Sequence, residues 1–175
     1  MRRLYSVTKA GHNGICITGT GNTVQNCKTY TNGNTGLNLK SGAGNNLITG
    51  CKSYDNYDKA KQGEDADGFG VKAGSASGNR FVNCESYNNS DDGWDFWDNQ
   101  YGVRLEGCYA HNNGRDVNGD GNGFKLGNDN TSANHYLKDC TATNNRACGF
   151  TQNGNKGANT YINCVSSGNG KADVR

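Results

Sequence analysis

Short alternations of apolar and variable positions recur along the chain, and each of them begins directly after a glycine. At six places a glycine is followed by an apolar residue and, two positions later, by a second apolar residue, except that the last place has Gln152. Such period-two alternation is typical of a short β-strand with one buried face. The pattern therefore predicts six short strands, which begin at Ile15, Leu37, Phe69, Trp94, Phe124 and Phe150.

A second set of repeats is centred on cysteine. Six cysteines follow one another at spacings of 24, 33, 24, 32 and 24 residues, each with an apolar or aromatic residue three positions before it and an asparagine five positions after it. Repeats of this length, with short strands and no helical periodicity, predict an all-β fold, a parallel β-helix of about six coils. The repeated residues are Cys27, Cys51, Cys84, Cys108, Cys140 and Cys164, with Asn32, Asn56, Asn89, Asn113, Asn145 and Asn169.

Stacking of equivalent residues explains how so polar a chain folds. The 175 residues include 27 glycines, no proline and only 32% hydrophobic residues, and the mean hydropathy is −0.90. In a β-helix, stacked asparagines bond to their copies in neighbouring coils, which satisfies buried amides, while cysteines and small residues fill the interior. The length predicts a single domain over residues 1–175.

The cysteines allow two interpretations. A disulfide framework is typical of small exported proteins. Stacked neighbours, however, have Cβ atoms about 4.8 Å apart, which is wider than the roughly 3.5–4.5 Å of a disulfide, so we expect a buried ladder of free thiols. Zinc is disfavoured because the sequence has no Cys-x-x-Cys pair.

The charges exclude two classes of partner. The net charge is only +2, from 18 basic and 16 acidic side chains, so we expect no nucleic acid and no anionic membrane as partner. No apolar stretch approaches the length of a membrane span or of a signal peptide. The chain is therefore expected either to stay inside the cell or to have lost a signal.

Two insertions interrupt the repeat at one corner of the coil. From cysteine to the next strand-opening glycine there are 9 residues in three coils, but 17 from Cys51 to Gly68 and 15 from Cys108 to Gly123. The extra residues form two expected loops, 57–67 and 114–122, on either side of the coil that carries Asp91. Loops on one edge of a rigid repeat usually build a binding site.

Acidic residues concentrate between these loops. Asp67 and Asp92 each precede the strand-opening glycine, so they occupy one column in adjacent coils, with Asp91 and Asp95 beside them. Like charges this close repel unless something offsets them. Because calcium takes several oxygen ligands at once and no soft ligand is near, these four residues predict a calcium site; exposed acids at a turn are the alternative.

Lys125 occupies the outward column one coil after Asp95. It is either a salt-bridge partner of the acids or, if calcium uses those acids, a lysine with a lowered pKa that accepts protons. Residues 116–121 match the start of an EF-hand loop, but the twelfth position is Gly127, so Asp116 and Asp120 remain only as a possible second cation site. The three histidines belong to different columns and are interpreted as structural: His12, His111 and His135.

Six segments resemble polysaccharide lyase family 9, which contains pectate lyases and rhamnogalacturonan endolyases. They run in order through nearly the whole chain: GHNGI at 11–15, NTGL at 34–37, GEDADGF at 63–69, NNSDDGWD at 88–95, GDGNGFKLG at 119–127 and GFTQN at 149–153. The resemblance implies a right-handed β-helix and calcium-dependent β-elimination. It further implies that Asp67, Asp91, Asp92 and Asp95 bind Ca²⁺ and that Lys125 is the catalytic base.

The expected function is therefore a secreted lyase that cleaves pectate, an acidic plant cell-wall polysaccharide, and leaves unsaturated uronides. Rhamnogalacturonan I is the alternative substrate, and a calcium-dependent pectin-binding β-helix without turnover is the alternative from another class. Members of the family are usually longer than this chain, which is interpreted as a trimmed form that lacks terminal caps or coils, a natural minimal form, or a piece of a longer protein.

Overall fold

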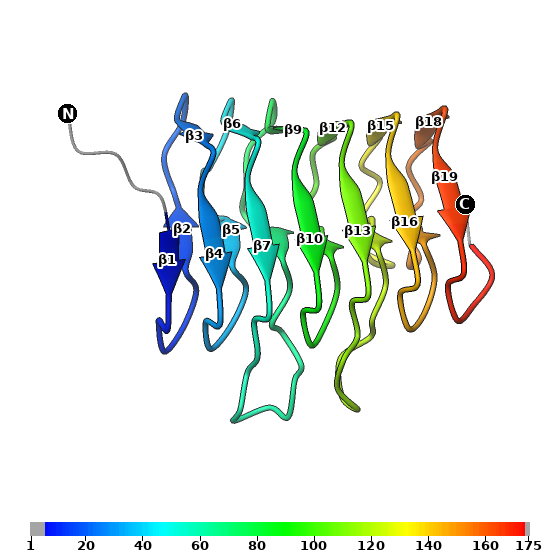
Figure 1. Cartoon of the computed structure of the whole chain (residues 1–175). Helices are drawn as coiled ribbons and strands as arrows, with labels where there is room; N and C mark the ends of the chain where they lie inside the picture. Colours follow the sequence, from blue (N-terminus) through cyan, green and yellow to red (C-terminus); the bar gives the residue numbers. More distant parts are fainter. Residues whose placement is uncertain (1–5, 174–175) are drawn as a thin grey trace.

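The computed structural model describes residues 6–173, which form a right-handed parallel β-helix (Figure 1). Three strands per coil contribute to three stacked sheets, and each strand pairs in parallel with its counterparts in the coils before and after it. Residues 6–173 contain no helix, and so none that could span a membrane. The fold predicted from the repeats is confirmed.

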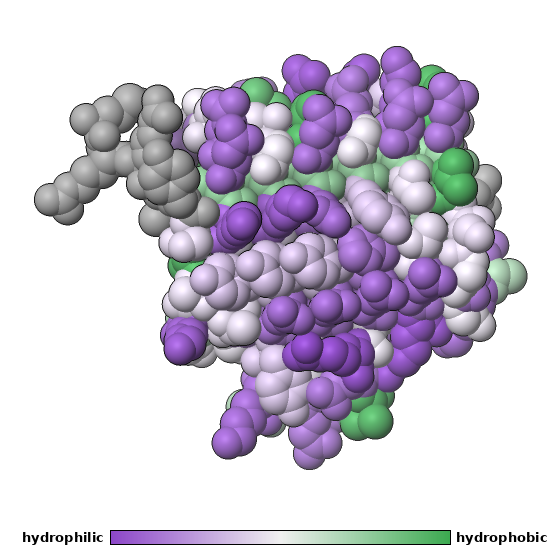
Figure 2. All heavy atoms as spheres, in the orientation of Figure 1, coloured by the Kyte–Doolittle hydropathy of each residue, from purple (hydrophilic) through white to green (hydrophobic). Residues whose placement is uncertain are grey.

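The seven-stranded sheet consists of β1 (Ser6–Thr8), β4 (Lys28–Tyr30), β7 (Lys52–Tyr54), β10 (Glu85–Tyr87), β13 (Tyr109–His111), β16 (Thr141–Thr143) and β19 (Val165–Ser167). One six-stranded sheet, which we call the site sheet, consists of β2 (Ile15–Ile17), β5 (Leu37–Leu39), β8 (Phe69–Val71), β11 (Trp94–Asp95), β14 (Phe124–Lys125) and β17 (Phe150–Thr151). The other consists of β3 (Thr23–Gln25), β6 (Leu47–Thr49), β9 (Arg80–Val82), β12 (Arg104–Glu106), β15 (Tyr136–Lys138) and β18 (Thr160–Ile162). Figure 2 shows that hydrophilic side chains cover most of the face over the seven-stranded sheet.

The site sheet is the one that the glycine-centred pattern predicts. Its inward column stacks Phe69, Trp94, Phe124 and Phe150 in register, with successive ring centroids 4.8, 4.7 and 4.9 Å apart. All four side chains are fully buried. Stacked aromatic rings fill the bore of the helix and fix which residues of each strand point outward.

The predicted asparagine ladder is present. Each side-chain amide donates to the side-chain oxygen of the next copy, over 3.0, 2.8, 3.0, 3.0 and 2.9 Å from Asn32 to Asn169. Each accepting oxygen also takes the backbone N–H of the preceding copy, as Asn89 Oδ1 does from Asn56. Buried amides are thereby satisfied without water.

A second ladder, which the repeat analysis missed, runs along the third sheet. Asn22, Asn46 and Asn79 donate from one to the next over 3.0 Å each, but Val103 takes the following place. His135 then continues the column, because its Nδ1 accepts the backbone N–H of Val103 at 3.1 Å. Burial lowers the pKa of His135 to about 4, so the ring is neutral and structural.

The chain turns its corners with residues of positive φ. The residue before each ladder cysteine has a φ between 51° and 62°, and it is always asparagine, aspartate or glycine. These residue types adopt the left-handed region at the lowest cost. The corner residues are Asn26, Gly50, Asn83, Gly107, Asp139 and Asn163. Along the neighbouring ladder, Cys51, Cys84, Cys108 and Cys140 are buried free thiols, as predicted.

Candidate functional site

The two predicted loops project from one corner of the β-helix, one between β7 and β8 and the other between β13 and β14 (Figure 1). They meet each other across the coil between them, where Asn118 Nδ2 donates to the Lys61 carbonyl at 3.3 Å. Asp91 ties both loops to that coil: one carboxylate oxygen accepts the N–H of Asp65 at 2.9 Å and the other that of Asp120 at 2.6 Å. The loops thus form one wall beside the site sheet.

Three of the four predicted ligands converge behind this wall. Asp67 and Asp92 precede β8 and β11, and Asp95 ends β11, so adjacent coils bring all three together. Carboxylate oxygens of the three lie within 4.8 Å of one another, and all three side chains are buried. Asp91 belongs instead to a second group, with Asp92 and Asp120. Asp116 is in neither of the two carboxylate groups found within residues 6–173.

Hydrogen bonds from neighbouring coils orient these carboxylates. Thr35 Oγ1 donates to Asp67 at 3.0 Å, the backbone N–H of Asn122 to Asp92 at 2.6 Å, and that of Trp97 to Asp95 at 3.0 Å. The donors come from three different coils, so stacking of the coils sets the geometry of the cluster. A carboxylate fixed in this way is preorganised for a ligand.

Burial gives the acids unusual proton affinities. It raises the pKa of Asp92 to about 7, although the charge of Lys125 opposes the rise. Burial, together with the charges of Asp92 and Asp67, raises the pKa of Asp91 to about 9. The pKa of Asp67 is raised mainly by burial as well. Buried carboxylates with raised pKa values need nearby positive charge to stay ionised.

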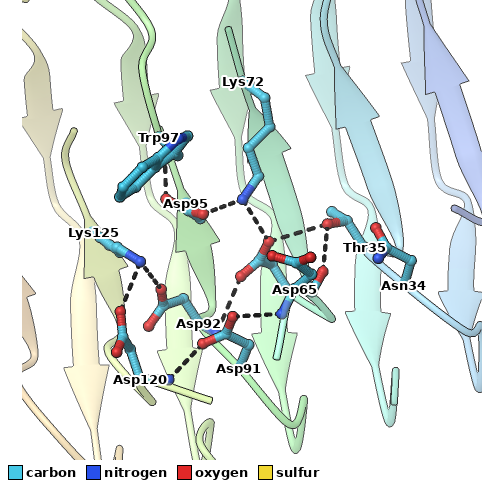
Figure 3. Close-up of polar contacts among 12 residues, drawn as sticks. Asn34, Thr35, Asp65, Lys72, Asp91, Asp92, Asp95, Trp97, Asp120 and Lys125 are labelled. Carbon is cyan, nitrogen blue, oxygen red and sulfur yellow. Dashed lines mark hydrogen bonds and ion pairs between the residues drawn. The ribbon is translucent and has the colours of Figure 1, made fainter. Parts of the chain in front are cut away.

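Two lysines supply part of that charge (Figure 3). Lys72, which follows β8, was missed by the sequence analysis: its ammonium lies between Asp67, at 3.0 Å, and Asp95. Lys125 on β14 is directly beside Asp95 in the register, as predicted, and pairs with Asp120 at 2.7 Å. Its Nζ is 3.3 Å from Asp92 Oδ2, without the alignment of a hydrogen bond.

The proton of Lys125 is held tightly in this arrangement. Burial works to lower the pKa of the ammonium, but the charges of Asp92 and Asp95 and the hydrogen bond to Asp120 outweigh it and raise the pKa above its usual value. The lowered pKa expected beside a bound cation requires that the same acids be neutralised by that cation first. The structure therefore describes Lys125 as a salt-bridge partner in the absence of a metal.

The donor set fits a hard cation. The Asp67, Asp92 and Asp95 group offers only oxygen atoms, and no thiol or imidazole belongs to it. Asp92 Oδ2 is buried and has no hydrogen-bond partner among residues 6–173. This carboxylate oxygen, which has no hydrogen bond from these residues and lies 3.3 Å from the Lys125 ammonium, is a good ligand for calcium, so the residues present suit this ion.

A pocket of about 420 Å³ opens beside the cluster, between the loop wall and the outward face of the site sheet. Trp97 contributes an exposed ring to it, with 49% of the residue accessible, and the Lys125 ammonium lies 5.6 Å from the ring centroid. The pocket is large enough for parts of a polymer to lie across several coils. Its lining also includes Asn34, Thr35, Asn38, Lys40, Glu64, Asp65, Lys72, Asn118 and Asp120.

Comparison with known proteins agrees with the resemblance noted from the sequence. The family described as "Pel9A-like, right handed beta helix region" matches residues 3–174. Pectate lyase L of Dickeya chrysanthemi is 41% identical over 170 residues, which cover 94% of this chain and 40% of that protein. Pectate lyase L of Paenibacillus polymyxa is 40% identical over an alignment 187 residues long, which covers 95% of this chain and 41% of that protein.

Two solved structures share the fold. The crystal structure of pectate lyase Pel9A matches with a TM-score of 0.91 and 41% identity, over 94% of this chain and 43% of that one. A rhamnogalacturonan lyase matches with a TM-score of 0.76 and 25% identity, over 91% of this chain and 44% of that one. The chain thus spans about two fifths of the length of these three pectate lyases. On these grounds the chain belongs to the Pel9A-like right-handed β-helix family, in polysaccharide lyase family 9.

Proposed function

We propose that this chain carries the active site of a calcium-dependent pectate lyase, which cleaves homogalacturonan outside the cell by β-elimination. The observation that supports this most is the register of the site sheet, which sets Lys125 directly beside Asp95 and the buried acids. A cation site and a candidate base thereby share one pocket wall. The names of the relatives point to the same chemistry.

In this proposal Asp67, Asp92 and Asp95 hold calcium, and Asp91 completes the set that the family resemblance implies. When bound, calcium would draw electron density from the uronate carboxylate and make the proton on C5 more acidic. Lys125 Nζ takes that proton. The electron pair of the C5–H bond forms a C4=C5 double bond, the bond between C4 and the glycosidic oxygen breaks, and the leaving oxygen takes a proton from water.

Lys125 must lose its own proton before it can act. With the three carboxylates committed to a cation, the negative charge that keeps the lysine protonated is offset, so its pKa falls back toward the ordinary lysine value of about 10.4. A base with such a pKa is more often neutral at alkaline pH. We therefore expect activity to rise between neutral and alkaline pH, and a flat profile would contradict the role of Lys125.

Two alternatives follow from specific observations. The match to a rhamnogalacturonan lyase supports rhamnogalacturonan I as a second candidate substrate. The polar pocket beside the acidic cluster would serve a pectin-binding role without turnover as well. In both alternatives calcium and the same pocket hold an acidic polysaccharide.

One experiment separates these functions. The protein is incubated with polygalacturonate or rhamnogalacturonan I, with calcium or with a chelator, and the ultraviolet absorbance of the new double bond is followed. We expect calcium-dependent absorbance on polygalacturonate, reduced about 10²–10⁴-fold in Lys125→Ala because a positioned base contributes that much. Lys28→Ala, an exposed lysine on β4, is the matched control.

The calcium affinity of each variant is measured in parallel by calorimetry. Retained calcium binding together with lost turnover in Lys125→Ala would support its role as the base. Absorbance on rhamnogalacturonan I alone would mean that this polymer, and not homogalacturonan, is the substrate. Absence of absorbance on both polymers, with calcium-dependent retention on immobilised pectin, would replace the lyase by the binding function.

A further inference from the structure

The pocket extends away from the acidic cluster to β5 and β8, where Asn38 and Lys40 line it. We propose that Asn38 and Lys40 form a subsite for an acidic sugar residue of the polymer, next to the sugar that meets the acidic cluster, and that Gly70 lets Asn38 take its place there. The inference rests on the proposed polysaccharide substrate. It assigns binding to residues outside the catalytic set.

The side-chain oxygen of Asn38 is a hydrogen-bond acceptor that lacks a donor among the described residues. The residue is only 6% exposed, lies on the outward face of β5 and lines the pocket, yet its Oδ1 finds no hydrogen-bond partner in the part of the chain that the structure describes. The ladder asparagines of the same protein are bonded to their copies, so this orphan is an exception to the way the fold treats buried amides. A buried polar atom without a partner that faces a pocket indicates a missing ligand.

The next coil packs against this acceptor through a glycine. Gly70 is the register partner of Asn38 on β8, and it is the one position in the outward column of the site sheet without a side chain. A Cβ on Gly70 would lie 2.8 Å from Asn38 Oδ1 and 3.3 Å from Lys72 Cε. The φ of Gly70 is not in the positive range, so the backbone does not require glycine here. The glycine therefore lets the Asn38 amide lie directly over the next strand, and a methyl group at position 70 would displace that amide.

Lys40 provides an uncommitted charge. Three lysines line the pocket, and two of them, Lys72 and Lys125, are held by carboxylates. Lys40 is half-buried and forms no ion pair with any residue between 6 and 173. It directly follows β5, as Lys72 follows β8, so the two lysines stack in adjacent coils. A lysine without a partner in a pocket is ready to bind an anion.

The Asn38 acceptor and the Lys40 ammonium together define the chemistry of the ligand. A uronate residue carries both a hydroxyl, which would donate to Asn38 Oδ1, and a carboxylate, which would accept from Lys40 Nζ. A neutral sugar offers only the first of these contacts. The subsite therefore selects a polymer with an acidic residue at this position, and a charged hydrogen bond of this kind is the stronger of the two contacts.

The test measures binding without turnover. In the calcium-saturated Lys125→Ala protein, calorimetry gives the Kd of trigalacturonate for three further changes: Lys40→Met, Gly70→Ala and the control Lys28→Met on β4. We expect about tenfold weaker binding for the first two, since a charge-assisted bond contributes about that much, and no change for the control. The calcium affinity should be the same in all four proteins.

A methyl-esterified trimer separates charge from shape. It should bind the parent and Lys40→Met proteins equally, because the ester has no carboxylate for the lysine. Thermal denaturation shows whether Gly70→Ala is folded, and Asn38→Ala replaces it if it is not. Wild-type protein with Lys40→Met alone should show a higher KM on polygalacturonate and an unchanged kcat.

The outcomes distinguish this inference from the lyase function. Kd values within about twofold of the parent for both Lys40→Met and Gly70→Ala, or for Lys40→Met and the replacement Asn38→Ala, would overturn the subsite, even if polygalacturonate is cleaved. No binding of trigalacturonate by the parent would overturn it as well. Lys40-dependent binding by a protein that cleaves neither polymer would leave the subsite standing and remove the lyase.

Discussion

The asparagine ladder and the acidic cluster are both columns of buried polar side chains in adjacent coils, but they differ in what satisfies them. In the ladder, each amide is both donor and acceptor, so identical neighbours such as Asn89 and Asn113 complete one another. In the cluster, the carboxylates of Asp67 and Asp92 only accept, so identical neighbours repel and need a donor or a cation from elsewhere.

The difference teaches how a repeat fold separates stability from function. Columns that keep one residue type, such as the ladder, hold the coils together. The outward column of the site sheet changes type at every coil, and Asn38, Asp95 and Lys125 of this column line the pocket. In chain order it reads Cys16, Asn38, Gly70, Asp95, Lys125 and Thr151.

The largest effect on stability should come from breaking the ladder at its centre. Asn89→Ala removes the acceptor of two Asn56 donors, at 3.2 and 2.8 Å. The backbone N–H of Asn56 is then buried without this partner, and its side-chain amide keeps only Ser53 Oγ, at 3.1 Å. We expect the free energy of unfolding to fall by about 3 kcal/mol, measured by denaturant titration. Gln25→Ala, an exposed amide on β3, should change it by less than about 0.5 kcal/mol. Equal losses for both would mean that the ladder contributes nothing beyond surface contacts.

A smaller effect concerns protons at the acidic cluster. The pKa values of Asp92 and Asp91 are raised to about 7 and about 9, so below these values the metal-free acids carry protons that a cation must displace. Since raised carboxyl pKa values disfavour metal binding as the pH falls, calcium affinity should drop about tenfold between about pH 7.5 and pH 5.5. Calorimetry at the two pH values checks this, and an affinity that does not depend on pH would show that the acids are already ionised.

The smallest effect should have the opposite sign to the ladder variant. Asp92→Asn removes a buried charge but keeps an oxygen that can accept the Asn122 N–H. Without metal and at about pH 8, we expect the free energy of unfolding to rise by about 1 kcal/mol, while the stabilisation by calcium disappears. Asp98→Asn, outside both carboxylate groups, is the matched control and should leave both quantities unchanged. If Asp92→Asn destabilised the protein instead, Asp92 would stabilise the fold, as the ladder asparagines do.

Much of the ladder and of the acidic cluster could be predicted from the sequence, because stacked residues lie at fixed offsets from the cysteine or the glycine of each coil. The cysteine and asparagine spacings predict the coils, and the glycine columns predict which residues of neighbouring coils meet, including the pairing of Asp95 with Lys125. The second ladder, which begins with Asn22 and runs along the third sheet, was missed because Val103 and His135 interrupt its series of asparagines. A repeat is detected only while its residue type persists.

The rest of the site depends on contacts that no repeat encodes. Lys72 stacks on Lys40, but the next residue in that column is Trp97, so the column gives no signal that its lysine turns toward the acids. Asp120 reaches Lys125 through the path of an inserted loop. The loop has no counterpart in other coils from which its course could be inferred.

The inserted loops have a consequence for protein engineering. Both leave the β-helix after a ladder asparagine and rejoin it before a strand of the site sheet, whose register with the neighbouring coils is undisturbed at Phe69 and Phe124. Coil length can therefore vary at this corner while the interior keeps its packing. Exchange of loops 57–67 and 114–122 between relatives, with Asp67 retained, would therefore change the wall of the pocket on an unchanged scaffold.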